Sequence, residues 1–271
     1  MNFDWKLPIE WCHSGLPQGN ALFGSLLWGN EENLKITFNR SDYWFYSDNL
    51  PPDKEQSYEN LKKYLSEGNE AEVKRIFGGF KDGKRPSSSS RLPMGRLDIA
   101  LPQKTPSSLT LDTSSSIGKF TNNSGSLKIK SVVPRTIPLL ALSIKGEQRG
   151  NCVFSSVPAD SEDITSFYKK HKFPSFRKMD AGNNKSGGWI QEVPGSRVLC
   201  VYWESSETSD TVELFLAAAL EADSDNAEKS AKKLVSNAIR QGFSSIASET
   251  RNWWNDYWKR VPRIIPPIAG F

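Results

Sequence analysis

The residues of this sequence whose types and spacing suit chemistry lie near its N-terminal end. Ser41-Asp42-Tyr43-Trp44 places a carboxylate beside aromatic side chains, directly after a segment of alternating apolar residues. Sugar sites use this combination, because an aromatic ring covers the C–H face of a pyranose while a carboxylate accepts hydrogen bonds from its hydroxyl groups. Protein cores and turns use the same residue types. We take Asp42 and Trp44 as candidate carbohydrate-binding residues, with a core or turn role as the alternative.

A third candidate, Asn20, lies in the segment Leu16–Gly24 (LPQGNALFG). Pro17 fixes φ, Gly19 permits a positive φ, and an asparagine side chain can bond to the nearby backbone. The segment therefore predicts a tight turn that leads into the first core strand. In the functional alternative, Asn20 is presented at an edge of the domain, toward a ligand or a neighbouring domain.

The sequence identifies no catalytic residue and no metal site. His13 and His171 are the only histidines, and they are too far apart for metal-ligand spacing or for a nucleophile–base pair. Asp98, Glu192 and Glu204 lie beside strong strand patterns. Glycoside hydrolysis requires two positioned carboxyl groups, and the sequence alone pairs none of the 31 acidic residues.

The absence of nucleotide and nucleophile motifs removes further classes of protein. No P-loop, G-x-G-x-x-G or G-x-S-x-G motif occurs, so no cofactor is predicted. Cys12, Cys152 and Cys200 form no C-x-x-C pair, so free thiols are expected.

Length and charge restrict the number of domains and the kinds of partner. A chain of 271 residues is long enough for one or two domains with a sizeable core. The formal net charge of +4 is spread along the sequence with no basic arm or stripe, which argues against nucleic acid as a partner. The first ten residues lack an apolar run and no segment reaches membrane-spanning length, so neither a signal peptide nor a membrane partner is expected. The sequence does not determine the native compartment, and a secreted or periplasmic parent protein is one of the alternatives.

Alternating apolar residues predict a mostly β body over residues 1–222. Two such segments flank the turn at 29–33 and predict a hairpin with one buried face. Later segments follow without helical patterns between them, which favours antiparallel pairing; they cover residues 97–101, 109–111, 127–129, 137–144, 189–193, 197–204 and 211–222. Residues 56–77 suit one or two short helices interrupted near Gly68. We expect a large antiparallel β-sandwich.

A long helical pattern occupies the C-terminal segment, residues 223–271. From Ala227 small and apolar residues recur at helical spacing, and no proline interrupts them before Pro262. The stripe ends in the aromatic residues Trp253, Trp254, Tyr257 and Trp258. Tryptophans gathered on the last turns of a helix need a large surface to cover them. We therefore predict a linker helix that docks on a partner.

Several of these segments resemble, in order, the opening of the family 95 glycoside hydrolases (α-L-fucosidases and α-L-galactosidases) and of related bacterial proteins of unassigned function. The segments are Trp11, LPQGN at 16–20, Phe23-Gly24, FNRSDYW at 38–44, LPMGRLDI at 92–99, and WWNDYWKR at 253–260, which is similar to their linker helix. Ala21 stands where the fucosidases usually carry glycine, and their acidic–Trp motif differs from Asp42-Tyr43-Trp44. The resemblance is therefore closer to the uncharacterised bacterial branch.

The resemblance implies a β-super-sandwich, a helical linker and a downstream catalytic (α/α)6 barrel beyond Phe271. In that family the acid and the asparagine-assisted base lie in the barrel, so no catalytic residue is carried onto this chain. The implied role is a non-catalytic N-terminal domain of a carbohydrate-active glycoside hydrolase. Such a domain packs on the barrel, here through Trp253, Trp254 and Trp258, and shapes the rim of its pocket.

Two alternatives remain from the sequence. The chain is a free-standing carbohydrate-binding module that uses exposed aromatic residues such as Trp44, or an interaction protein that docks through its aromatic C-terminal helix. Glycan binding that depends on Trp44 separates the first from the second.

Overall fold

The computed structural model describes residues 2–45, 55–77, 90–102, 104, 106–112, 115–122, 126–161, 167–170, 172–180, 184–193, 195 and 197–260. The chain forms two compact units, residues 1–43 together with 93–271, and residues 44–92. The division expected at residue 222 falls between the last strand and the first C-terminal helix, both of which belong to the first unit.

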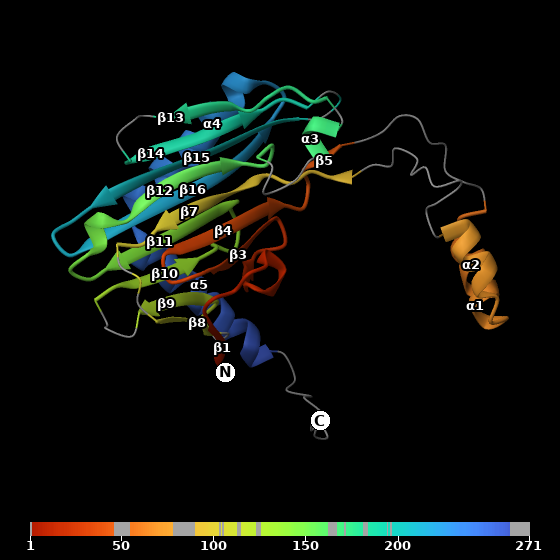
Figure 1. The fold of residues 1–271 in the computed structure, drawn as a ribbon, viewed down its shortest axis with the longest axis horizontal. Coiled ribbons are helices and arrows are strands. Elements are labelled where there is room, and N and C mark those ends of the chain that lie inside the picture. Colours follow the sequence, from red (N-terminus) through yellow and green to blue (C-terminus); the bar gives the residue numbers. More distant parts are fainter. Residues whose placement is uncertain are drawn as a thin grey trace. The chain divides into compact units, whose positions relative to one another are not determined.

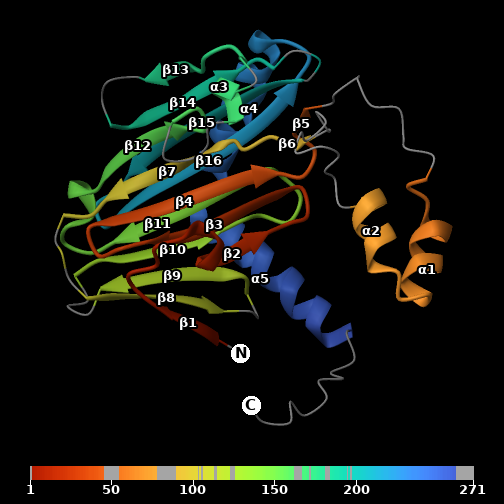
Figure 2. The same cartoon turned by 45° about the vertical axis from the view of Figure 1, so that its right-hand side comes forward.

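The first unit is an antiparallel β-sandwich, as predicted. Two sheets lie face to face (Figures 1 and 2). The larger has nine strands in the order β1-β8-β9-β10-β11-β16-β15-β14-β13, and the smaller has five in the order β12-β7-β4-β3-β2. Neighbouring strands pair antiparallel throughout the described residues.

The bounds of the strands follow the chain. The nine-stranded sheet contains β1 (Asn2–Lys6), β8 (Ser107–Asp112), β9 (Ile117–Asn122), β10 (Lys128–Val132), β11 (Leu139–Lys145), β13 (Arg177–Asp180), β14 (Ser186–Gln191), β15 (Val198–Glu207) and β16 (Thr211–Glu221). The five-stranded sheet contains β2 (Leu16–Gly19), β3 (Phe23–Gly29), β4 (Asn33–Arg40), β7 (Gly95–Ala100) and β12 (Val153–Pro158).

The main core lies between the two sheets. Along β3 and β4 every second residue is buried, because successive side chains of a strand point to opposite faces. Phe23 and Phe38 stack with ring centroids 6.0 Å apart, and Phe38 stacks in turn on Trp189 of the larger sheet at 5.8 Å. This aromatic stack crosses the sandwich.

The predicted hairpin and the strong later strands are confirmed, whereas five strands of the sandwich, and β5 (Trp44–Phe45) and β6 (Ser90–Arg91) outside it, were not predicted. Those five are β1, β2, β9, β12 and β13. They are short, and β2 and β9 contain glycine, so their apolar alternation is weak. Pairing with neighbouring strands, some of them distant in sequence, makes them strands.

The expected long C-terminal helix is two helices, α4 (Ser224–Gln241) and α5 (Phe243–Arg260), and this corrects the single helix. Asp223 caps α4 by accepting a hydrogen bond from the Asn226 N–H at 2.8 Å. Gly242, at φ 76°, ends it, and its N–H donates to the Ala238 carbonyl at 2.8 Å. A glycine with positive φ stops helix propagation and redirects the chain.

Both helices lie on the outer face of the nine-stranded sheet (Figures 1 and 2). The helix α4 packs mainly on β15 and β16, and the first half of α5 packs on β10 and β11. Their small residues, such as Ala227, Ala231 and Ala247, allow close approach to the sheet. The apolar stripe over 227–247 is therefore covered by the chain's own sheet.

The remaining described elements are short. The first unit also contains the 3₁₀ turns η1 (Cys12–Ser14) and η2 (Arg149–Asn151) and the helix α3 (Phe167–Lys170). The second unit contains β5 (Trp44–Phe45), α1 (Tyr58–Ser66), α2 (Glu70–Phe77) and β6 (Ser90–Arg91). The predicted helical break near Gly68 is confirmed, because Gly68 has φ 66° between α1 and α2.

Candidate functional site

The side chain of Asn20 holds the turn between β2 and β3. Its Oδ1 accepts hydrogen bonds from the Leu22 and Phe23 N–H groups at 3.1 and 2.8 Å. Its Nδ2 donates to the carbonyl oxygens of Pro134 and Ile137 at 2.6 and 2.9 Å. The amide thus ties the five-stranded sheet to the loop between β10 and β11. Contact with a substrate would require Asn20 to give up one of these internal bonds.

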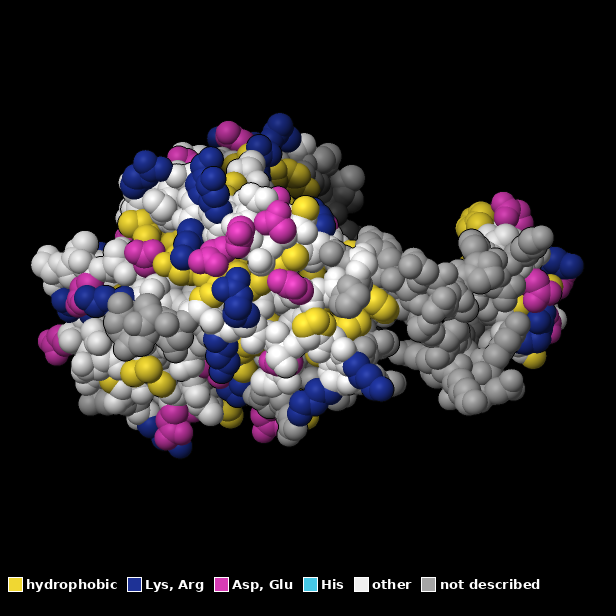
Figure 3. Space-filling view, turned by 90° about the horizontal axis from the view of Figure 1, so that it is seen from above, with side chains coloured by type: hydrophobic (Ala, Val, Ile, Leu, Met, Phe, Trp, Pro, Cys, Tyr) yellow, Lys and Arg dark blue, Asp and Glu magenta, His cyan; other side chains and the backbone are white. Residues whose placement is uncertain are grey.

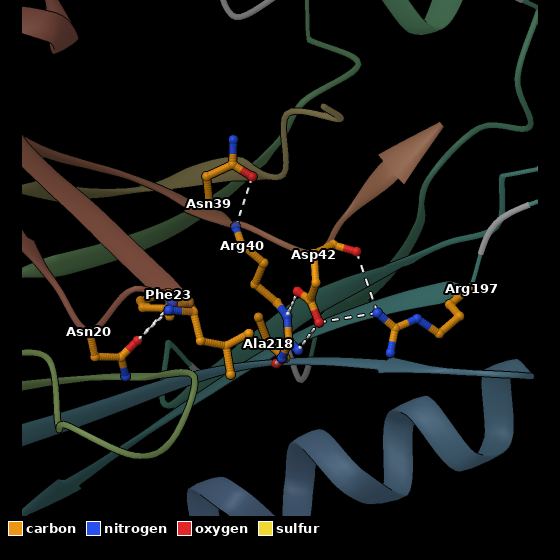
Figure 4. A network of polar contacts seen from close by, with 8 residues as sticks. Asn20, Phe23, Asn39, Arg40, Asp42, Arg197 and Ala218 are labelled. Carbon is orange, nitrogen blue, oxygen red and sulfur yellow. Dashed lines mark hydrogen bonds and ion pairs between the residues drawn. The ribbon is translucent and has the colours of Figure 1, made fainter. Parts of the chain in front are cut away.

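Asp42 lies just past β4, between two arginines (Figure 4). Its carboxylate accepts two bonds from Arg40, each 2.9 Å long, and one from Arg197 Nη2 at 3.1 Å. The bonds from Arg40 lower the pKa of the Asp42 carboxyl, and Arg197 adds to this, although partial burial opposes it. A carboxylate stabilised in its charged form is a poor general acid at neutral pH.

Arg40 is the centre of this cluster, and sequence reasoning did not select it. Its residue is only 7% exposed, and its Nη1 donates to the Ala218 carbonyl oxygen on β16 at 2.6 Å. The buried guanidinium is therefore satisfied by a carboxylate on one side and by a backbone carbonyl on the other. The spacing Arg40-Ser41-Asp42 was the only available signal, because Ala218 and Arg197 are distant in sequence.

Trp44 begins the second unit and is held within it. It lies on β5 and pairs with Arg91 of β6, and the Arg91 guanidinium carbon is 5.5 Å from the centroid of its ring. The indole is half-buried. Of the three candidate residues, Asn20 and Asp42 therefore belong to the sandwich and Trp44 to the smaller unit.

The aromatic end of α5 forms a cluster of four stacked rings. Trp253 stacks on Tyr257 at 5.3 Å and Trp254 on Trp258 at 5.8 Å, one helical turn apart, and edge contacts link the two pairs. The guanidinium of Arg135 lies over Trp253 at 5.2 Å. Tyr257 remains 36% exposed and Trp258 42% exposed. This end of α5 extends past the sheet (Figure 2).

The two halves of α5 therefore have different environments. Phe243, Ile246, Ala247 and Thr250 are buried against the sandwich, whereas residues 251–260 are half-buried or exposed. The Phe243 N–H donates to Glu213 Oε2 at 3.0 Å, which fixes the start of the helix on β16. A rigidly anchored helix thus presents an aromatic end to the solvent.

Other polar groups are engaged in the fold. Asp98 accepts bonds from Arg96 at 2.7 and 3.1 Å, and Glu204 accepts one from the Tyr202 hydroxyl at 3.0 Å. Among the described residues, no group of three or more His, Cys, Asp or Glu side chains could hold a metal ion. Glu192 is exposed, and His171 lies outside the described residues.

The expected free thiols are confirmed for all three cysteines. Burial raises the pKa of the Cys152 thiol to about 11 and that of the Cys200 thiol to about 12. Buried thiols held neutral in this way are poor nucleophiles. Their role in the structure is packing.

No protein-family model matches the chain, and no curated protein matches it. Within the described residues, no helix combines the length and the apolar character that crossing a membrane requires.

Proposed function

We propose that this chain is a non-catalytic N-terminal β-sandwich domain of a carbohydrate-active glycoside hydrolase, and that it docks on a downstream helical catalytic barrel. The observation that carries the proposal is the division of α5 into a buried half and an exposed aromatic half. The ordered resemblance of segments 11–44, 92–99 and 253–260 to the family 95 enzymes supports the choice of enzyme class.

The aromatic residues at the end of α5 are of the type found at the centres of protein interfaces. Aromatic side chains present roughly 150 to 250 Å² each, and burial contributes ~25 cal/mol per Å² of apolar area. Covering the exposed 42% of Trp258 alone would therefore contribute about 2 kcal/mol. Because the four rings already stack on one another, little side-chain entropy is lost on docking.

The three candidate carbohydrate-binding residues have different environments. Asn20 and Asp42 hold the sandwich together, and Trp44 has a half-buried indole in the smaller unit. We propose that Trp44 supplies the direct sugar contact and that Asn20 and Asp42 position the neighbouring segments. Replacing Trp44 by alanine should then weaken glycan binding while the fold stays intact.

The docking proposal is tested by adding the helical domain encoded downstream, produced separately, to the present chain. Calorimetry should show association with the wild-type chain and at least tenfold weaker association with the Trp253→Ala/Trp254→Ala/Trp258→Ala variant, as expected for interface hot spots. Trp11→Ala is the matched control, because Trp11 is 64% exposed elsewhere on the sandwich. Equal association of all three proteins, or an open reading frame that encodes no helical domain, would exclude the proposal.

The non-catalytic part is tested separately. The isolated chain should release no product from aryl glycosides. Robust hydrolysis by this chain alone would place the chemistry within these residues.

A further inference from the structure

Four lysines from three neighbouring strands meet on the outer face of the nine-stranded sheet. They are Lys119 on β9, Lys128 and Lys130 on β10, and Lys145 on β11, and we call them the lysine patch. Ile129 and Ser131 alternate with the β10 lysines and are buried, which places the lysines on the solvent side. All except the half-exposed Lys119 are exposed.

The lysines stand directly opposite one another in the sheet. Lys119 pairs in register with Lys130, and Lys128 pairs with Lys145. Like charges at directly opposed cross-strand positions destabilise a sheet. Only Lys145 has an acidic partner among the described residues, Asp210 at 3.4 Å. The fold therefore maintains two unfavourable pairs on one surface.

The two C-terminal helices cover other parts of this outer face. The helix α4 covers β15 and β16, and α5 covers β10 and β11 near Val132 and Ala141. The face shown in Figure 3, by comparison, has basic and acidic side chains mixed over it. The lysine patch is thus a local concentration of one sign of charge on a chain whose formal net charge is only +4.

The side chains around the patch indicate which kind of anion it suits. Across the sheet one row runs Asp4, Thr110, Lys119, Lys130, Ser143 and Glu213, so its lysines lie between acidic ends. The next row runs Lys6, Ser108, Thr121, Lys128, Lys145 and Thr211 and contains no acidic residue. Strands lie ~4.8 Å apart and side chains on one face repeat every ~6.8 Å, so the ammonium groups form a repeating array beside hydroxyl groups. Neither row contains an aromatic side chain on which a nucleic-acid base could stack.

We propose that the lysine patch binds an anionic polysaccharide, whose uronate or sulfate groups repeat along the polymer. The choice of a glycan among polyanions rests on the proposed carbohydrate-active function. Lysine side chains are flexible point charges. They therefore suit anionic groups spaced along a polymer better than they suit a single carboxylate bound through two parallel hydrogen bonds. Thr121 is half-exposed beside them and its hydroxyl can bond sugar hydroxyls, whereas the Thr110 hydroxyl donates to Asp4 Oδ1 at 2.8 Å.

The test compares two variants of the full chain with equal charge change. Lys119→Gln/Lys128→Gln/Lys130→Gln replaces three of the four patch lysines and breaks both opposed pairs, and Lys229→Gln/Lys232→Gln/Lys233→Gln replaces three lysines of α4. Heparin and polygalacturonate serve as anionic probes, dextran as the neutral probe, and duplex DNA and anionic vesicles as the other polyanions. Affinity is measured by calorimetry over a series of salt concentrations.

The patch variant should bind the anionic glycans about tenfold more weakly with a reduced salt slope, and the α4 variant should bind like the wild type. The urea midpoint of the patch variant should equal or exceed that of the wild type, because the like-charge pairs are gone. Equal losses in both variants, tighter binding to DNA or to vesicles, or no binding to either glycan would each overturn the proposal. None of these results bears on docking by α5, which the association experiment tests independently.

Discussion

Arg40 donates from Nη1 to the carbonyl oxygen of Ala218 at 2.6 Å, and this bond joins the end of β4 to β16 across the sandwich. The same guanidinium holds Asp42 with two further bonds. The fixed geometry of a planar, five-donor group allows one buried side chain to bridge both sheets. Arg40 therefore stabilises the end of β4, which the chain leaves toward Trp44.

Replacing Arg40 by alanine should destabilise the chain by about 2 to 3 kcal/mol, because the Ala218 carbonyl and the Asp42 carboxylate lose their partner. Arg197→Ala is the control. It should cost less than about 1 kcal/mol, since the Arg197 side chain is 51% exposed and its ion pair with Asp42 is screened by solvent. Urea unfolding monitored by tryptophan fluorescence measures both changes. Equal costs would contradict the bridging role of Arg40.

The contribution of Asp42 to stability should depend on pH. Because the arginines lower its folded-state pKa below the ordinary value of 3.8, the unfolded chain binds the proton more readily. The stabilisation is therefore present above 3.8 and is lost as the pH falls through the folded-state pKa. The difference in unfolding free energy between wild type and Asp42→Asn should shrink over that range. In an Arg40→Ala background this difference in unfolding free energy should change much less with pH. The same pH dependence with and without Arg40 would refute the assignment of the lowered pKa to Arg40.

Ala21→Gly should stabilise the chain by about 0.5 to 1 kcal/mol. Ala21 has φ 70°, a left-handed conformation that costs an L-residue roughly 1 to 2 kcal/mol, while the greater freedom of glycine in the unfolded chain offsets part of the gain. Thermal unfolding provides the measurement. Ala21→Val should act in the opposite direction, because a β-branched side chain fits this conformation poorly, and a stabilised valine variant would count against the geometry.

Gly95→Ala should destabilise the chain by more than about 2 kcal/mol. A Cβ atom there would lie 2.5 Å from the Val157 carbonyl oxygen and 2.7 Å from Trp189 Cζ2, at a φ of +130°. Gly195→Ala is the matched control, because Gly195 also has a positive φ but nothing lies within 4 Å of its added Cβ. Chemical unfolding of the two variants should differ clearly, and similar midpoints would show that Trp189 does not pack against Gly95 as described.

The sequence was sufficient for features that depend on local pattern. Alternation along 34–39 and the strongly apolar run over 211–222 predicted strands that the structure contains, and the spacing after Ala227 predicted helical structure there, although as one helix rather than two. The break at Gly242 was missed, because an isolated glycine in a helical pattern does not by itself determine its φ. The tight turn at Asn20 was predicted, but its bonds to Pro134 and Ile137 were not.

The mainly β class, the periodicity of the strands and the aromatic end of the last helix can be read from the sequence, because they follow from the order of neighbouring residues. Tertiary structure alone decided which distant groups meet. Arg40 and Ala218 are 178 positions apart, and the lysine patch assembles from β9, β10 and β11 although the sequence showed no basic stripe. Strand order and register bring such residues together, and these depend on the packing of the whole sandwich.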